Sequence, residues 1–330
     1  MTSATRSPAP ALPPLALLAG DRWRVHVDLA RTVWPDGGRR GAVVSAPGRH
    51  VRRRAEPGTA GPLLLEVRVE PAGTVCEVWG PPTTPPPEVA RALVDSAAWA
   101  GLHDTPHDLD AVVGGHPVLR GLLRARGEVR LSRLPRVGEA VGRAVLGQLV
   151  QGLEARRSTA QVAARCGTAA PGGLWAWPTA RQLGSTPAHA LRRCGVSLRG
   201  AAALHAACVR EARLAEAVGD WPLLDTRLRA LPGIGAWTSG EARLSLGDPD
   251  AVAVGDYHLP SVVGCVLGGR AARGSSRTDW DDVRMLELLA PFAGQRGRVI
   301  RLCAWAVRRG LAPGPERRRH RQPLSAHRYW

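Results

Sequence analysis

Two glycines flank a single isoleucine in the stretch LPGIGAWT, residues 231–238, which joins two segments of helical periodicity. Pro232 prevents the first helix from continuing, and Gly233 and Gly235 allow backbone angles and close approaches that a Cβ would block. Backbone N–H groups at the start of the second helix could therefore meet a phosphate directly. The alternative is a tight turn closed by a C-cap glycine, which needs only one glycine. The spaced pair favours a helix–hairpin–helix that holds a nucleic-acid backbone, with Ile234 as the apolar plug between the helices.

A carboxylate follows this hairpin. The Gly/Pro-rich segment LGDPDAVAVGDYHLP places Asp256 twenty-one residues after Gly235, immediately before a new helical pattern. A fixed carboxylate facing the anomeric carbon of a sugar stabilises the positive charge that develops when an N-glycosidic bond breaks, or orients water. A helix N-terminus also favours the ionised form. The alternative role of Asp256 is that of a plain helix N-cap, which is common for Asp in this place.

The charge balance favours a polyanionic partner. The 330 residues carry 45 basic side chains, all of them Arg, against 28 acidic ones, for a net charge of +17. Compositional bias explains the choice of Arg over Lys but not the excess of positive charge. Because no basic amphipathic helix or lipidation signal accompanies it, the excess indicates nucleic acid before a membrane surface. The absence of Lys also leaves no side-chain amine that could form a Schiff base.

The six cysteines lie far apart, without a C-x-x-C pair or a tight cluster. Their spacing argues against a zinc or iron–sulfur site, so no metal ligands are predicted, and it indicates reduced thiols in a cytoplasmic protein. No apolar run reaches the length of a membrane span, and two prolines interrupt the apolar stretch near the N-terminus.

The elements that must position the hairpin and Asp256 belong to a mainly α fold. Residues 1–20, rich in Pro and Ala, predict a disordered leader. Alternating patterns at Trp23–Leu29 and Leu63–Val69 predict strands, so 21–104 reads as a small β-rich domain that ends with a helix after the prolines at 81–87. Residues 105–310 predict an all-helical body and 311–330 a basic tail. The expected helices of the body are 117–126, 138–153, 156–166, 199–217, 222–230, 236–246, 257–267, 282–290 and 295–309.

The hairpin, the Gly/Pro-rich segment and Asp256 together resemble the helix–hairpin–helix superfamily of DNA glycosylases that act in base-excision repair. A second block, EAVGRAVLGQLVQGLEARRSTAQVA at 139–163, is similar to the helix ahead of the hairpin in the bacterial 3-methyladenine DNA glycosylase II family. The resemblance covers about 105–310. It implies a monomeric, nucleoid-associated enzyme that flips an alkylated purine out of double-stranded DNA and hydrolyses its N-glycosidic bond. No metal or organic cofactor is implied, although hairpin carbonyls could hold a monovalent cation.

The resemblance also implies roles for individual side chains. Trp237 stands where lyase branches of the superfamily have a Schiff-base lysine, and together with Tyr257 it would line the base pocket. Leu149, following Gln148, matches the apolar wedge that fills the space left by an extruded base. Thr238 completes the set of residues expected at the DNA backbone, with Gln148 and the hairpin. From the residues alone, Trp237 and Leu149 could equally be core side chains and Tyr257 could cap a contact between helices.

Two further ring-bearing residues near the predicted site and two alternative functions also follow from the sequence. His258 is interpreted as structural, and Trp305 lies one position from where a pocket aromatic would align. With one Phe and two Tyr in the chain, a base pocket depends on its 11 Trp, which leaves the preferred lesion undefined. The alternatives are a glycosylase for mismatched or deaminated bases and a non-catalytic protein that binds damaged DNA.

Overall fold

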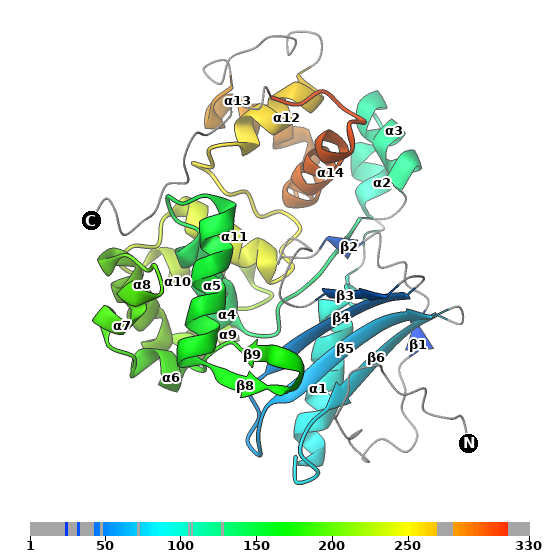
Figure 1. Ribbon diagram of the computed structural model, residues 1–330. Coiled ribbons are helices and arrows are strands. Elements are labelled where there is room, and N and C mark those ends of the chain that lie inside the picture. Colours follow the sequence, from blue (N-terminus) through cyan, green and yellow to red (C-terminus); the bar gives the residue numbers. More distant parts are fainter. Residues whose placement is uncertain are drawn as a thin grey trace.

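The computed structural model describes residues 49–70, 73–104, 106, 108–126, 129–268 and 280–315, together with short backbone strands at 24–25, 32–33 and 43–46. Within these residues an antiparallel sheet precedes a helical body (Figure 1). The predicted fold class, mainly α with a small β-rich N-terminal part, is confirmed. The predicted leader over 1–20 and most of the predicted tail, from 316 onward, lie outside the described residues.

The sheet has the strand order β1-β6-β5-β4-β3, and every pair in it is antiparallel. Helix α1 (Pro86–Trp99) covers one face of it (Figure 1), and Pro occupies the first turn of α1, where a missing N–H costs nothing. Leu63 and Leu65 on β5 are buried against α1. The strands are β1 (Arg24–Val25), β3 (Val43–Ala46), β4 (Arg49–Glu56), β5 (Leu63–Glu70) and β6 (Gly73–Trp79).

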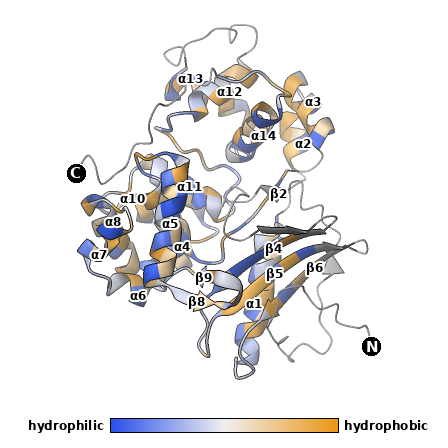
Figure 2. Ribbon diagram, viewed as in Figure 1, coloured by the Kyte–Doolittle hydropathy of each residue, from blue (hydrophilic) through white to orange (hydrophobic). Residues whose placement is uncertain are grey.

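The helical body has two apolar cores, and the chain passes from one to the other and back. The first is built by α4 (Val137–Leu146), α5 (Gly152–Cys166), α6 (Ala180–Gly184), α7 (Ala188–Arg193), α8 (Leu198–Val209), α9 (Glu211–Glu216), α10 (Trp221–Arg229) and α11 (Ala236–Ser245). The second is built by α2 (Asp108–Val113), α3 (Pro117–Arg126), α12 (Leu259–Leu267), α13 (Asp282–Leu289) and α14 (Arg296–Arg309). Figure 2 shows the apolar surfaces of α2, α3 and α12 gathered in the second half. Short pairs, β2 (Thr32–Val33) with β7 (Arg130–Leu131) and β8 (Thr168–Ala170) with β9 (Leu174–Ala176), complete the fold.

Two of the predicted helices differ from the observed ones. The helix expected over 138–153 ends at Leu146, and the residues from Gly147 to Gln151 form a turn before α5 begins. The helix expected over 199–217 is interrupted at Arg210, whose backbone (φ −111°, ψ 10°) separates α8 from α9. Helices α2, α6 and α7 and the β8–β9 hairpin were not predicted, because they are too short for a periodic pattern. Strand β4 was not predicted either, because the sequence RHVRRRAE has no alternation of apolar and polar residues.

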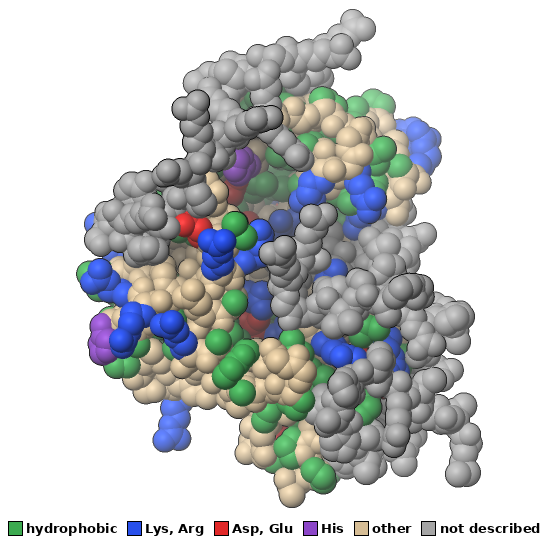
Figure 3. Space-filling model, viewed as in Figure 1, with side chains coloured by type: hydrophobic (Ala, Val, Ile, Leu, Met, Phe, Trp, Pro, Cys, Tyr) green, Lys and Arg blue, Asp and Glu red, His purple; other side chains and the backbone are tan. Residues whose placement is uncertain are grey.

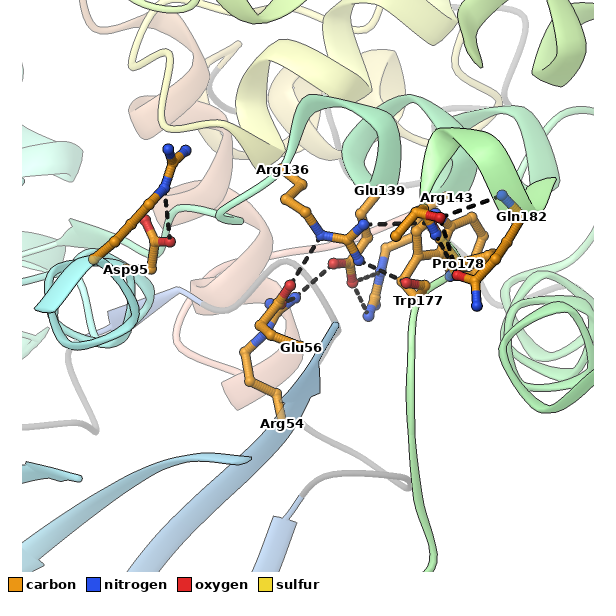
Figure 4. A network of polar contacts seen from close by, with 11 residues as sticks. Arg54, Glu56, Asp95, Arg136, Glu139, Arg143, Trp177, Pro178 and Gln182 are labelled. Atoms are coloured by element: carbon orange, nitrogen blue, oxygen red, sulfur yellow. Dashed lines mark hydrogen bonds and ion pairs between the residues drawn. The ribbon is translucent and has the colours of Figure 1, made fainter. Parts of the chain in front are cut away.

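A buried ionic network joins the sheet to the helical body (Figure 4). The guanidinium of Arg54, on β4, lies between the carboxylates of Glu56 and Glu139, and Glu139, on α4, is 1% exposed. Arg143 Nη2 lies 2.7 Å from Glu139 Oε1, and Arg136 Nε donates to Glu56 Oε2 at 2.9 Å. Burial alone would raise the pKa of Glu139, but the surrounding Arg charges outweigh it and lower the pKa to about 2. The network therefore fixes the sheet to the helix that leads into Gly147 to Gln151.

Candidate active site and nucleic-acid interface

The two glycines of the hairpin between α10 and α11 have different structural roles. Gly233 has a φ of +79°, which favours glycine, and a Cβ there would make a tight contact of 3.3 Å with the Cβ of Ala203. Gly235 has an ordinary φ of −95°, and no atom lies within 4 Å of a Cβ built on it. Glycine at 235 is therefore not needed by the described protein itself. It keeps an open surface beside the helix N-terminus clear. Ile234 is buried in the first core, as predicted for the apolar plug.

The start of α11 presents free donors to that open surface. Gly235 is the N-cap residue, and no side chain caps the helix. Among the described residues, no acceptor meets the backbone N–H groups of Gly235, Ala236 or Trp237. An uncapped helix N-terminus with a partial positive charge is suited to a phosphate oxygen.

Gln148 ties the turn after α4 to this hairpin. Its Nε2 donates to the carbonyl oxygen of Gly233 at 2.8 Å and to Thr238 Oγ1 at 2.8 Å. Thr238 is buried, so its side chain is not exposed to a DNA backbone. The two side chains expected at the DNA backbone, Gln148 and Thr238, thus bond to each other and shape the hairpin.

Leu149 is the next residue in the turn, and it is not a core residue. Its side chain is 82% exposed, and its φ of +56° is the one positive value at a non-glycine residue in the described chain. A leucine in left-handed backbone costs about 1 kcal/mol or more. Because the leucine side chain is exposed, no burial of apolar surface offsets this cost. The alternative role of Leu149 as a core side chain is therefore wrong, and its role as a wedge stays a prediction.

Three N–H donors hold the carboxylate of Asp256. Its Oδ1 accepts from the backbone N–H groups of His258 (2.7 Å), the N-cap residue of α12, and of Leu259 (3.0 Å), the first residue of that helix. Its Oδ2 accepts from the indole Nε1 of Trp237 at 2.9 Å. Gly255, with a φ of +92°, turns the chain into this position. Asp256 is therefore not the N-cap residue of α12: one of its oxygens bonds to the N–H groups at the start of that helix, and a side chain from α11 orients the other.

The aromatic residues expected in the pocket lie on different parts of the site. Trp237 is half-buried, and its ring reaches back to the end of α4, where a Cβ on Gly147 would lie 3.0 Å from Cη2. Tyr257 is 43% exposed, with its ring edge-on to that of His258 at 4.8 Å between centroids. Trp305 packs on the second core, and the guanidinium of Arg126 lies 5.0 Å from its ring centroid.

A charged pair near Asp256 was not predicted. Glu241, one helical turn after Trp237 on α11, faces Arg301 of α14, with 3.8 Å between Oε1 and Nη2. Burial and the negative charge of Asp256 raise the pKa of Glu241, and Arg301 partly offsets them. The pair spans the two halves of the body. In the space-filling view the surface is hollowed between the parts that carry α11 and α12 (Figure 3).

Neither the family models nor the curated protein sequences match this chain. Solved structures do match its fold. A 3-methyladenine DNA glycosylase from Archaeoglobus fulgidus superposes with a TM-score of 0.63 at 19% identity, over 82% of this chain and 91% of that chain. An 8-oxoguanine glycosylase/lyase from Clostridium acetobutylicum, in complex with double-stranded DNA, gives 0.58 at 13% identity, over 83% and 90%.

A third structure, the Schizosaccharomyces pombe 3-methyladenine DNA glycosylase in complex with abasic DNA, gives 0.50 at 18% identity over 60% of this chain and 96% of that one. The chain has the fold of the helix–hairpin–helix DNA glycosylases. The fold expected from the resemblance is thereby confirmed. In this glycosylase fold the short hairpin, Leu149 and Asp256 come from three separate connections between helices, and the network around Gln148 and Trp237 links them.

Among the described residues, no group of three or more His, Cys, Asp or Glu side chains is arranged to hold a metal ion. In the same part of the chain, no helix combines the length and apolarity that crossing a bilayer requires.

Proposed function

We propose that the protein is a monofunctional DNA glycosylase that extrudes an alkylated purine of the 3-methyladenine type from double-stranded DNA and hydrolyses its N-glycosidic bond. The observation that carries the proposal is the carboxylate of Asp256, held by Trp237 and two backbone N–H groups beside an uncapped, glycine-lined helix N-terminus. A structural cap alone does not require the indole donor. The similar folds, which include glycosylases bound to DNA, support the same assignment.

In the proposed reaction the groups of the site have different tasks. The N–H groups at the start of α11 bind a backbone phosphate of the damaged strand without reading its sequence. Leu149 enters the base stack and occupies the space that the extruded nucleotide leaves, which slows its return. Asp256 stabilises the positive charge that develops on the sugar as the bond to the base breaks, and it orients the attacking water. Trp237 fixes the direction of that carboxylate, and the ring of Tyr257 offers an exposed aromatic surface to a cationic base.

The proposed reaction stops at the abasic site. Cleavage of the strand by β-elimination needs an amine that traps the opened sugar as a Schiff base. The sequence contains no Lys, and the guanidinium of Arg stays protonated. Incubation with abasic DNA and borohydride should therefore trap no covalent complex, and the strand should break only after separate alkali treatment. A trapped adduct within 129–268 would contradict the monofunctional assignment.

No metal or organic cofactor takes part in the proposed chemistry. A monovalent cation on the hairpin carbonyls would strengthen the phosphate site, but the carbonyl oxygen of Gly233 already accepts a hydrogen bond from Gln148. We propose that the enzyme acts as a monomer in the cytoplasm on nucleoid DNA.

The experiment that tests the function is base release from a panel of 32-mer duplexes, each with one defined base: 3-methyladenine, 7-methylguanine, hypoxanthine, 8-oxoguanine, or a mismatch. We expect the alkylated purines to be released fastest. Faster release of hypoxanthine or of a mismatched base would assign the substrate to the deaminated or mismatch class. Tight binding to these duplexes with no release of any base would instead indicate a damage-binding protein.

A further inference from the structure

A cavity of about 630 Å³ lies between α5 and α7, apart from the residues around Asp256. Arg157 enters it from α5, and His189, Arg192 and Arg193 enter it from α7. The acidic side chain on its wall is Glu154. Figure 3 shows basic side chains over this part of the surface. The cavity thus combines a concave shape with an excess of positive charge.

Within the described residues, no acidic side chain forms an ion pair with the three guanidinium groups. Arg157, Arg192 and Arg193 are exposed, and none makes an ion pair or hydrogen bond with another described residue. Other Arg side chains in the described part of the chain are paired, as Arg143 is with Glu139 and Arg296 is with Asp250. Unpaired charges that converge on one concave surface repel each other, so a bound anion would lower the free energy of the arrangement.

Stabilisation of the helix itself does not explain the cluster. Arg192 and Arg193 stand in the last turn of α7, where basic side chains complement the helix dipole. However, α7 has only six residues, and its dipole gives no reason for Arg157 to face the same cavity from another helix. The shared feature is the cavity.

Three consecutive residues connect the cavity to the proposed site. Gln148 bonds to the hairpin, Leu149 projects into solvent, and Val150 lines the cavity. The residue before the exposed leucine thus contacts the hairpin, and the residue after it lines the basic cavity. If Leu149 enters the base stack, one strand passes the hairpin and the other passes the cavity.

We infer that this cavity binds the sugar-phosphate backbone of the strand opposite the extruded base, with Arg157, Arg192 and Arg193 as its phosphate contacts. The inference rests on the proposed function, because Leu149 must enter the duplex for the strands to be divided in this way. Gripping the second strand would keep the duplex from moving away as the wedge enters. The contacts carry no sequence information, which suits an enzyme that must examine every sequence.

The test compares two triple variants that lose the same charge. The cavity variant is Arg157→Gln/Arg192→Gln/Arg193→Gln. The control replaces Arg124, Arg210 and Arg213 by Gln, three exposed Arg side chains without ion pairs in the described chain. Binding is measured from 50 to 300 mM salt on a duplex with a tetrahydrofuran abasic analogue. It is also measured on the analogue strand alone and on duplexes with neutral methylphosphonates in the opposite strand.

For the cavity variant we expect roughly tenfold weaker duplex binding at 0.1 M salt and a slope of log K against log salt that is smaller by about two to three. The control should change the slope by less than one. Binding to the single strand should be the same as for the parent. Methylphosphonates opposite the lesion should weaken the parent and the control, but should not weaken the cavity variant further.

Equal behaviour of the two triple variants would overturn the inference, and so would an equal loss on the single strand, which would place the cavity on the damaged strand. A parent protein that binds none of the DNA probes would instead refute the proposed function, so the two failures are distinguishable. Melting temperatures of both variants within about 2 °C of the parent confirm that the comparison concerns folded proteins.

Discussion

Replacing Trp237 by Phe removes one of the three donors on Asp256 and keeps an aromatic ring in place. The lost bond is the one from the indole Nε1 to Oδ2, at 2.9 Å. A hydrogen bond to a charged acceptor contributes about 1.5–3 kcal/mol. The side chains of Trp237 and Asp256 are only half-buried, so the lower end of this energy range applies. Because about 1.4 kcal/mol corresponds to a tenfold change in rate, base release should slow about tenfold.

The assay is single-turnover release of the best-cleaved base from a duplex, with enzyme in excess so that binding does not limit the rate. The decisive comparison is a double-mutant cycle with Asp256→Asn. If Trp237 acts by orienting the carboxylate, Trp237→Phe should have almost no effect on the rate once Asp256 is already Asn. Tyr257→Phe, which keeps its ring and removes a hydroxyl elsewhere in the site, serves as a matched control for aromatic change.

Two results would refute this reasoning. One is a rate for Trp237→Phe within twofold of the parent, which would make the indole bond irrelevant to catalysis. The other is an undiminished tenfold loss in the Asp256→Asn background, which would show that Trp237 acts on the base or on packing. In both cases the melting temperature must stay near that of the parent for the test to count.

Leu149→Gly should raise stability slightly by relieving the left-handed backbone and yet slow release from duplex DNA, while release from single strands stays unchanged; equal slowing on both would exclude a wedge. Gly235→Ala should melt like the parent and bind duplex DNA more weakly, whereas Gly233→Ala should lower the free energy of unfolding by about 1 kcal/mol. If Gly235→Ala bound duplex DNA as tightly as the parent, Gly235 would serve only to form the turn. Glu139→Gln, facing Arg54, should destabilise the fold by about 3 kcal/mol at pH 7. Because the folded pKa of Glu139 lies below the ordinary value of 4.5, its contribution is full above that pH and disappears toward pH 2, so parent and variant should converge in acid urea titrations.

The parts of the site that were predictable have local signals. Pro232 and the paired glycines stop one helix and start the next, and Asp256 follows a Gly/Pro-rich segment at the start of α12. Each of these signals acts within a few residues, so periodicity and turn chemistry are enough to place them. The strands of the sheet were likewise predictable where one face alternates, as at Leu63 and Leu65.

The parts that were not predictable depend on contacts between distant segments. Leu146, Leu149 and Leu153 keep a helical spacing, so the pattern continues a helix that in fact ends at Leu146. The turn is set by Gln148 bonding to the hairpin and by the ring of Trp237 against Gly147. The Glu241–Arg301 pair brings together residues on different helices, and neither residue has a local signal.

The most direct test of the central claim is the rate of base release by Asp256→Asn. The Asn side chain can keep its oxygen on the N–H groups of His258 and Leu259, so both keep their acceptor. The negative charge is gone, however, and an amide NH₂ faces the indole donor. We predict that this variant melts like the parent and binds the abasic-analogue duplex as tightly, while it releases the damaged base about a hundredfold more slowly or worse. Release at close to the parental rate by the folded, DNA-binding variant would contradict the catalytic role of Asp256 and, with it, the proposed active site.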